Sequence, residues 1–386
     1  MNRSDTKETG TRALEAIGVF IKRNVVLCVA LVAALVSSII VPPDAQYLGY
    51  FDFKTLTCLF CVLAVVCALK NINFFYILAC EIVRRFKNIR MSVIAIVYIT
   101  FIGSMLIAND MALLTFLPLG YFVLSTTDNK KYMAFLFIMQ NIAANLGGML
   151  TPFGNPQNLY LYTRFNIPTG EFMTVMLIPF LLSIALITLC CIVFVKSEPL
   201  VITGERQQID KKKAIVYGAL FALSIAIVFR GIPYQLGLLI IPAAIFFLDR
   251  RALADVDYPL LLTFAAFFVF SGNVARIEAV REVAEALLSK NTLLVSTLSC
   301  QLISNVPSSI LLSSFTDNYR QLLVGVNIGG AGTLIASLAS LITLKEYTKH
   351  DREGVGAYIK LFSIVNFSFL GILLVVMLAV FGAGVL

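Results

Sequence analysis

Two stretches of the sequence match each other and place glycine, asparagine and hydroxyl side chains in apolar surroundings. Residues 145–159 read Asn-Leu-Gly-Gly-Met-Leu-Thr-Pro-Phe-Gly-Asn-Pro-Gln-Asn-Leu, and residues 327–341 align with them without a gap, at an offset of 182 positions (327 − 145 = 182). The identical pairs are Asn145 and Asn327, Gly147 and Gly329, Gly148 and Gly330, Thr151 and Thr333, and Leu159 and Leu341; Asn155 and Asn158 correspond to Ser337 and Ser340. Amide, hydroxyl and freed carbonyl oxygens suit a hard cation such as Na⁺, and free backbone amides suit an anion. The paired stretches therefore predict a binding site for small ions.

Both stretches interrupt segments that are otherwise apolar enough to cross a membrane, residues 133–162 and 321–344. An unsatisfied backbone group in hydrocarbon costs several kcal/mol, so a broken helix persists only inside protein or beside a watery cavity. Paired interrupted helices in two halves of a membrane chain indicate the binding site of a transporter. Alternatively, Asn145, Gly147 and Gly148 could serve only to let two helices pack closely, as small residues do in membranes. The recurrence of the motif in the second half favours a role in binding an ion or solute.

Two further polar clusters lie inside apolar segments, at Asn109-Asp110 in residues 91–125 and at residues 304–309 in residues 292–317. A single helix over 91–125 would be about 50 Å long, compared with a hydrocarbon core of about 30 Å. Basic residues flank this segment on both sides, which predicts a re-entrant hairpin of two half-length helices entering from the cytoplasm. The alternative is two tilted spans joined by a polar loop. The sparse basic flanks of the second segment predict a hairpin that enters from outside.

Asp110 is the only acidic residue near the middle of any apolar stretch. A carboxylate at that depth is costly unless it is paired, and it marks a functional site by default. Asp110 could carry a proton or a cation, or it could cap the second half of the hairpin. Asn366, in the last apolar segment, has no counterpart in the first half and predicts an ordinary hydrogen bond between helices.

The composition indicates an all-α polytopic membrane protein. The opposite entry sides of the two hairpins predict two inverted-topology repeats, each with a re-entrant hairpin and an interrupted transmembrane helix. The chain has 386 residues, is 59% hydrophobic and 13% charged, and has a mean hydropathy of +0.90, whereas soluble domains are about half apolar and about a quarter charged. The net charge of +8 comes from basic residues in short loops, which suits cytoplasmic anchoring and not a nucleic acid partner. We expect a multi-pass protein of the cell (inner) membrane, surrounded by lipid, with a cytoplasmic N-terminus.

No pattern typical of an enzyme is present, so we expect no catalytic residue, no bound metal centre and no cofactor beyond a coupling ion. The single histidine, His350, lies among loop charges and is expected to be solvated. The eight cysteines lie in or beside apolar segments, and Cys58 and Cys61 are expected to be buried small side chains. A channel is a competing interpretation, because broken helices also line pores.

The sequence predicts two halves joined by a basic linker. The predicted segments are an N-terminal interfacial segment (1–23), a first repeat (24–195), a cytoplasmic linker (196–213) and a second repeat (214–386). Amphipathic stretches at residues 70–90 and 275–290 precede the two hairpins and are expected to lie at the membrane interface.

The motif at residues 145–158 resembles the fingerprint of the ion transporter superfamily, which includes divalent anion:sodium symporters, citrate transporters, arsenite pump membrane subunits and a branch of Na⁺/H⁺ antiporters. The resemblance extends from about residue 24 over both hairpins and both breaks. It implies a homodimer in which a transport domain, here residues 91–162 and 292–344, moves like an elevator. Dicarboxylate symporters of this group carry Ser-Asn-Thr at each hairpin tip, whereas this chain has Ala108-Asn109-Asp110 and Ser304-Asn305-Val306.

Together these observations predict a secondary transporter that couples Na⁺ or H⁺ to symport of a small anion, such as a di- or tricarboxylate or an inorganic oxyanion. The expected cation ligands are Ser104, Asn109, Asp110, Gly154 and Asn155. The expected substrate ligands are Asn145, Thr151, Asn158, Ser304, Asn305, Thr333, Ser337 and Ser340. An antiporter that exports arsenite or Na⁺ against protons, with Asp110 as proton carrier, is the alternative within transport, and an anion channel is the alternative outside it.

Overall fold

The computed structural model describes residue 18, residues 24–200 and residues 208–386. Nearly all of the predicted interfacial segment 1–23, and residues 201–207 of the predicted linker, lie outside the described residues. The named elements of the described chain are all helices. Six helical stretches, two of which combine adjoining named helices, are long and apolar enough to cross a membrane. The prediction of an all-α polytopic membrane protein is confirmed.

The chain forms two compact units, each of which combines segments from both predicted repeats. One unit comprises Met1–Asp52 and Asp257–Glu282, and the other comprises Phe53–Val256 and Val283–Leu386. The sequential division at the linker therefore does not coincide with the compact units. It remains a prediction about repeat organisation.

The smaller unit pairs α2 (Val25–Ile40) with α13 (Tyr258–Val274) and includes the 3₁₀ helix η1 (Ala45–Tyr50). Asn273 Nδ2 donates hydrogen bonds to the hydroxyls of Ser37 and Ser38, each at 3.2 Å. The Arg276 guanidinium lies 2.8 Å from the Asp44 carboxylate, and this hydrogen bond holds the pKa of Asp44 below its usual value. These polar contacts fix the pairing of two helices whose remaining side chains are mostly apolar.

In the larger unit, a group of helices packs around α3 (Phe53–Asn71), which is almost completely buried. The helices in contact with it are α4 (Phe74–Val83), α5 (Ile89–Ile107), α8 (Pro156–Arg164), α10 (Lys211–Val228), α11 (Tyr234–Leu248) and α12 (Arg250–Ala254). Asp210 caps α10 by accepting a hydrogen bond from Lys213 N. Cys58 and Cys61 are buried on α3, as expected from the sequence.

Residues 89–126 form two antiparallel arms, α5 and α6 (Asn109–Thr126), joined only by Ala108. α5 has 19 residues and α6 has 18, which corresponds to about 27–28 Å each, so each arm has about half the length of a single helix over this segment, as predicted. Arms of this length are also long enough to cross the membrane. Length alone therefore does not separate a hairpin from two spans. The tip nevertheless contacts the break in the neighbouring helix through Asn109 and Asn145, and this contact supports the hairpin.

The second hairpin is formed by the end of α14 (Glu278–Ile303) and the short α15 (Asn305–Leu312). Its turn is confined to Ser304, because residues 305–309 already belong to α15, so the broad turn expected at 304–309 is corrected. α14 contains non-helical backbone at Asn291. The side chain of Asn291 accepts a hydrogen bond from Leu294 N, so this residue separates the amphipathic part of α14 from the hairpin arm.

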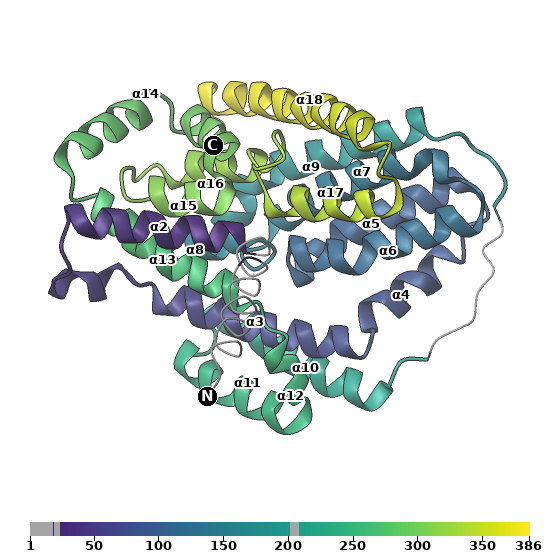
Figure 1. The fold of residues 1–386 in the computed structure, drawn as a ribbon, viewed down its shortest axis with the longest axis horizontal. Coiled ribbons are helices and arrows are strands. Elements are labelled where there is room, and N and C mark those ends of the chain that lie inside the picture. The colour runs from purple at the N-terminus through teal and green to yellow at the C-terminus, as the bar shows by residue number, and fades with distance from the viewer. Residues whose placement is uncertain (1–17, 19–23, 201–207) are drawn as a thin grey trace, which may run out of the picture. The chain divides into compact units, whose positions relative to one another are not determined.

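Both interrupted helices are broken as predicted. The first runs as α7 (Met133–Gly147), η3 (Gly148–Leu150) and α8, and the second as α16 (Tyr319–Ile328) and α17 (Leu338–His350). α5, α6 and α7 pack against one another, and α17 packs against α6 and α7 (Figure 1). His350, at the end of α17, stacks on the Tyr121 ring with centroids 3.6 Å apart. His350 is an exposed residue, as expected from the sequence, and the stacking on Tyr121 is an additional contact.

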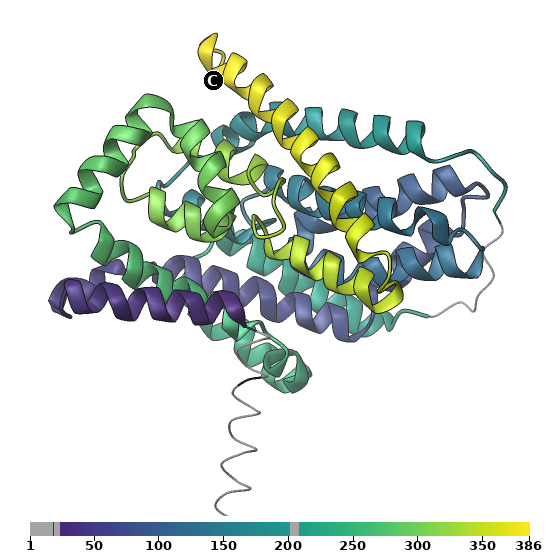
Figure 2. The ribbon, with the colours of Figure 1, turned by 45° about the horizontal axis from the view of Figure 1, so that its top comes forward.

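Two long helices pack on the outside of these elements, α9 (Thr169–Phe194) and the continuous α18 (Val355–Gly382) (Figure 2). Both expose large apolar side chains, as expected for lipid contact. Asn366 of α18 donates to Phe362 O of its own helix, so the predicted bond between helices was wrong.

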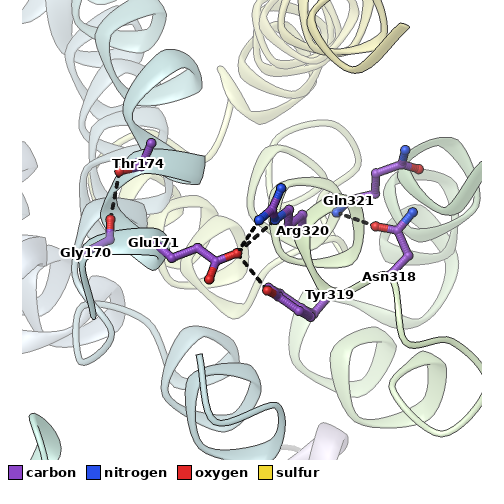
Figure 3. A network of polar contacts seen from close by, with 7 residues as sticks. All are labelled: Gly170, Glu171, Thr174, Asn318, Tyr319, Arg320 and Gln321. Carbon is purple, nitrogen blue, oxygen red and sulfur yellow. Dashed lines mark hydrogen bonds and ion pairs between the residues drawn. The ribbon is translucent and has the colours of Figure 1, made fainter. Parts of the chain in front are cut away.

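The first turn of α9 is bound to the first turn of α16 by a cluster of polar side chains (Figure 3). Glu171 lies 2.6 Å from the Arg320 guanidinium and accepts a 2.7 Å hydrogen bond from the Tyr319 hydroxyl. The pair is partly exposed, and exposed ion pairs contribute less than about 1 kcal/mol. The cluster therefore sets the orientation of α9 on α16 more than it adds stability.

Candidate functional site

The two hairpin tips share an unusual backbone conformation. Ala108 has φ 65° and ψ 154°, and Ser304 has φ 73° and ψ 159°. This region is nearly exclusive to glycine, and a residue held there costs on the order of 1–3 kcal/mol, which is typical of functional sites. In each tip the next residue is asparagine, and its Oδ1 accepts the following backbone N–H: Asp110 N at 3.0 Å from Asn109, and Val306 N at 2.9 Å from Asn305. The two tips therefore present matching asparagines at the start of α6 and α15.

The two helix breaks also match at the residue from which each second half-helix starts. Asn155 (φ −135°, ψ 143°) precedes α8, and Ser337 (φ −148°, ψ 142°) precedes α17. These residues occupy equivalent positions in the repeat, since 155 + 182 = 337. Pro156 begins α8 with a residue that lacks an N–H, which suits the first position of a helix.

An asparagine network joins the two breaks and one hairpin tip. Asn145 Oδ1 accepts hydrogen bonds from Asn109 Nδ2 at 3.2 Å and from Ser337 Oγ at 2.8 Å. Asn327 Oδ1 accepts from Asn155 Nδ2 at 3.3 Å. Asn145, at the first break, is therefore bonded to Ser337, which precedes α17 at the second break. In the same way Asn327, at the second break, is bonded to Asn155, which precedes α8 at the first. These hydrogen bonds join segments separated by about half of the chain.

The carbonyl groups freed by the first break are bound by one side chain. Asn158 Nδ2 lies 3.1–3.3 Å from the carbonyl oxygens of Gly148, Met149 and Thr151. Asn158 Oδ1 also accepts a 2.6 Å hydrogen bond from Asn327 Nδ2. Asn158 therefore holds the first break together and ties it to the second.

A different residue binds the second break. Gln301 Nε2 donates to Gly329 O at 2.8 Å and to Ala331 O at 3.3 Å, while its Oε1 accepts from Thr333 N at 2.9 Å. Sequence reasoning missed Gln301. The available signal was a glutamine three residues before the Ser304 tip, within an apolar hairpin arm.

The predicted site residues are not all part of this network. The network includes Asn109, Asn145, Asn155, Asn158 and Ser337. Asn305 N donates to Ala336 O beside Ser337, and Thr333 is bound by Gln301 at the second break. Ser104 donates to Phe101 O and lies against Gly147, at the contact between α5 and α7. Thr151 donates to Met105 O, Ser304 donates to Ala336 O, and Gly154 packs on Gly148. Ser340 is fully buried on α17.

Two polar atoms of the network have no hydrogen-bond partner among the described residues, although both are buried. They are Asn145 Nδ2, a donor, and Asn155 Oδ1, an acceptor. Buried polar groups are paired in most proteins, and an exception calls for a bound ion, water or ligand. The network can therefore receive both a cation, at an oxygen, and an anion, at an N–H.

The electrostatics around the network come mainly from backbone and neutral side chains. The described residues contain no group of three or more His, Cys, Asp or Glu that could hold a metal ion. Half-helices α6, α8, α15 and α17 all begin at a hairpin tip or a break, and helix N-termini carry partial positive charge that favours anions. Asp110 lies in the first turn of α6 and is the acidic residue at a hairpin tip.

Paired hairpins at paired helix breaks, within a bundle of membrane-length helices, have the organisation of a secondary transporter. The profile of a family described as "Citrate transporter" matches residues 13–319. The chain belongs to this citrate transporter family, and it is a membrane transporter and not an enzyme.

Two curated relatives agree with this assignment. An uncharacterized transporter of Methanocaldococcus jannaschii is 33% identical over 307 residues, which cover 78% of this chain and 83% of the relative. The inner membrane protein YbiR of Escherichia coli is 30% identical over 303 residues, which cover 76% of this chain and 80% of that protein. The resemblance to the ion transporter superfamily inferred from the motifs is confirmed.

Proposed function

We propose that this protein couples the inward movement of a cation, Na⁺ in the first instance, to symport of a small carboxylate-bearing anion. The observation that carries this proposal is the pair of unpartnered buried atoms, Asn155 Oδ1 and Asn145 Nδ2, where a hairpin tip meets both breaks. Na⁺ prefers oxygen ligands, which Asn155 Oδ1 and the neighbouring break carbonyls can supply. The anion would bind the free N–H groups at the half-helix N-termini, and the family description suggests citrate or a related acid.

The transport cycle belongs to the same proposal. Binding of the cation between the Asn109 tip and the 148–155 break would fix the two relative to each other and complete the anion site beside Asn305 and Ser337. Both hairpins, with α7, α8, α16 and α17, would then move as one body within each subunit of a homodimer. H⁺ is the alternative coupling ion.

An antiporter is the second candidate function, and Asp110 is the observation that favours it. Its carboxylate lies in the first turn of α6, at the hairpin tip. A carboxylate there could release a proton on one side of the membrane and bind Na⁺ on the other. Proton-driven export would then need no anion site.

Thermal unfolding of the purified protein distinguishes these functions. We expect one anion from a panel of citrate, succinate, phosphate and arsenate to raise the melting temperature in Na⁺ but not in K⁺ at equal ionic strength. A ligand at 100 times its Kd adds about 2.7 kcal/mol to the free energy of unfolding. No anion effect at any pH, together with a Na⁺ effect that Asp110→Asn removes, would replace the symporter with the antiporter.

The variant Asn155→Ser is a matched test of the cation site. Serine is the residue that occupies the equivalent position before α17, and there it accepts a hydrogen bond from Ala339 N. The variant should therefore begin α8 normally while losing the Oδ1 atom and the two hydrogen bonds that Nδ2 donates to Asn145 O and Asn327 Oδ1. We expect it to fold and to lose the Na⁺-dependent shift.

A further inference from the structure

The contact between α7 and α17, hereafter the α7–α17 seam, runs from the asparagine network to the end of α17. At the network, Asn145 Oδ1 is bonded to Ser337 Oγ at 2.8 Å. Further along, the rings of Phe137 and Tyr347 pack edge to face with centroids 6.4 Å apart. These two contacts show that the helices are antiparallel. The midpoint of α7 between them is Asn141, and its register places it opposite the buried stripe of Ser340 and Thr343.

Polar groups in the middle of the α7–α17 seam lack partners. Asn141 Nδ2, Asn141 Oδ1 and Ser340 Oγ are buried and have no hydrogen-bond partner among the described residues. Both side chains are 0% exposed. Polar atoms without partners in an interior are costly and point to bound water or an ion. A water needs two to four polar partners, and these three atoms supply that number.

The residue beside Asn141 shows what a structural amide looks like in the same helix. Gln140 is equally buried, and its Oε1 also has no hydrogen-bond partner among the described residues, but its Nε2 donates to Thr100 Oγ1 at 3.1 Å and to Phe116 O at 2.9 Å. Gln140 therefore joins α7 to α5 and α6. Asn141 has no comparable hydrogen bond among the described residues.

The second half of the chain indicates that folding does not require these polar groups. The residue equivalent to Asn141 is Leu323 (141 + 182 = 323), which is fully buried in α16. The residue equivalent to Ser340 is Asn158, which binds the carbonyls of its break. At the second break, Gln301 binds the freed carbonyl groups instead. Ser340 is therefore not needed to bind them.

We propose that Asn141 and Ser340 form a hydrated cation subsite, one helical turn from Asn145, that the coupling cation occupies on its way to the asparagine network. Asn141 Oδ1 and Ser340 Oγ offer neutral oxygen ligands, and Asn141 Nδ2 donates to a water of the same cluster. Neutral amide and hydroxyl oxygens with water suit a hard monovalent cation that is bound weakly enough to leave. Occupation of this subsite by the coupling cation rests on the function proposed above. The presence of water between Asn141 and Ser340 does not depend on that function.

Thiol labelling of the full-length protein tests hydration without any transport measurement. Ser340→Cys is compared with Ala339→Cys, because both parent residues are 0% exposed on the same helix. The unsubstituted protein, with its eight native cysteines, gives the background. We expect a small charged thiol reagent to modify Ser340→Cys at least about tenfold faster than Ala339→Cys, and Na⁺ to slow the reaction. Equal, background-level labelling would overturn the subsite, and labelling that Na⁺ leaves unchanged would overturn its assignment to the cation.

Transport and thermal stability of Asn141→Leu and Gln140→Leu give the second measurement. Leucine occupies both equivalent positions in the second half, Leu322 and Leu323. Asn141→Leu should keep or raise the melting temperature and slow cation-driven uptake at least about tenfold, whereas Gln140→Leu should lower the melting temperature. Wild-type uptake by Asn141→Leu would overturn the proposal. A wild-type protein that moves no anion under any cation gradient would contradict the proposed function, and the labelling result would still decide the hydrated subsite.

Discussion

Replacing Asn158 with leucine is expected to abolish transport and to lower the free energy of unfolding by at least about 3 kcal/mol. The side chain binds three carbonyl groups of the first break and accepts a hydrogen bond from Asn327. Each buried polar group that loses its partner costs about 1–3 kcal/mol. Leucine removes the Asn158 bond from four such groups, of which Thr151 O keeps a hydrogen bond from Gly154 N. Denaturant titration in detergent measures the stability, and uptake into proteoliposomes measures the function.

Asn366→Leu is the matched control for this variant. Asn366 is also fully buried, but it donates only to Phe362 O within α18, and its Oδ1 has no partner among the described residues. We expect the change in stability to remain within about 1 kcal/mol, because one ordinary hydrogen bond contributes about that amount. Equal losses for Asn158→Leu and Asn366→Leu would show that Asn158 does not hold the break.

Gly147→Ala should destabilise the protein by about 1–3 kcal/mol, the range for an overpacked core, and should remove cation binding. A methyl group at Gly147 would overlap Phe101 O and lie 2.7 Å from Ser104 Oγ. The first of these atoms is backbone, so α5 and α7 must separate. α5 also leads to the Ala108 tip, and the separation would move Asn109 away from Asn145. The Na⁺-dependent shift in melting temperature reports this loss.

Gly371→Ala in α18 controls for the substitution itself. A methyl group at Gly371 meets no described atom within 4 Å, and alanine is favoured over glycine in a helix by about 1 kcal/mol. Stability should therefore be unchanged or higher. If Gly147→Ala matched this control, the close approach of α5 and α7 at Gly147 would be disproved.

The sequence was sufficient to predict the helical membrane class, the family and the positions of the hairpins and breaks. The repeated motif carried most of this information, because Asn145 and Asn327 align at a constant offset. The two break positions followed from the same alignment. Glycine and proline interrupt helices, and an interrupted helix at membrane depth must lie inside protein or beside a watery cavity.

The pairing inside the site could not be predicted in the same way. An alignment shows that Asn155 and Ser337 are equivalent. It does not indicate that Asn155 contacts Asn327 and that Ser337 contacts Asn145. The function of Gln301 was hidden because it replaces Asn158 from a different helix. The strained conformation of Ala108 was also hidden, since alanine gives no signal of a positive φ.

The compact units were not predictable from the order of the segments. α2 and α13 come from different predicted repeats, yet they pair within one unit. The hydrogen bonds from Asn273 to Ser37 and Ser38 stabilise this pairing. None of these three residues belongs to a motif, so local pattern gave no indication of the contact.

Uptake of labelled citrate by proteoliposomes with an inward Na⁺ gradient tests the central claim most directly. The account predicts accumulation above the external concentration, which disappears when Na⁺ is equal on both sides and in Asn155→Ser. If another carboxylate of the panel gave the thermal shift, it would replace citrate as the labelled probe. Movement of the anion that only equilibrates across the membrane, at a rate independent of the Na⁺ and H⁺ gradients, would contradict coupled symport and indicate a channel.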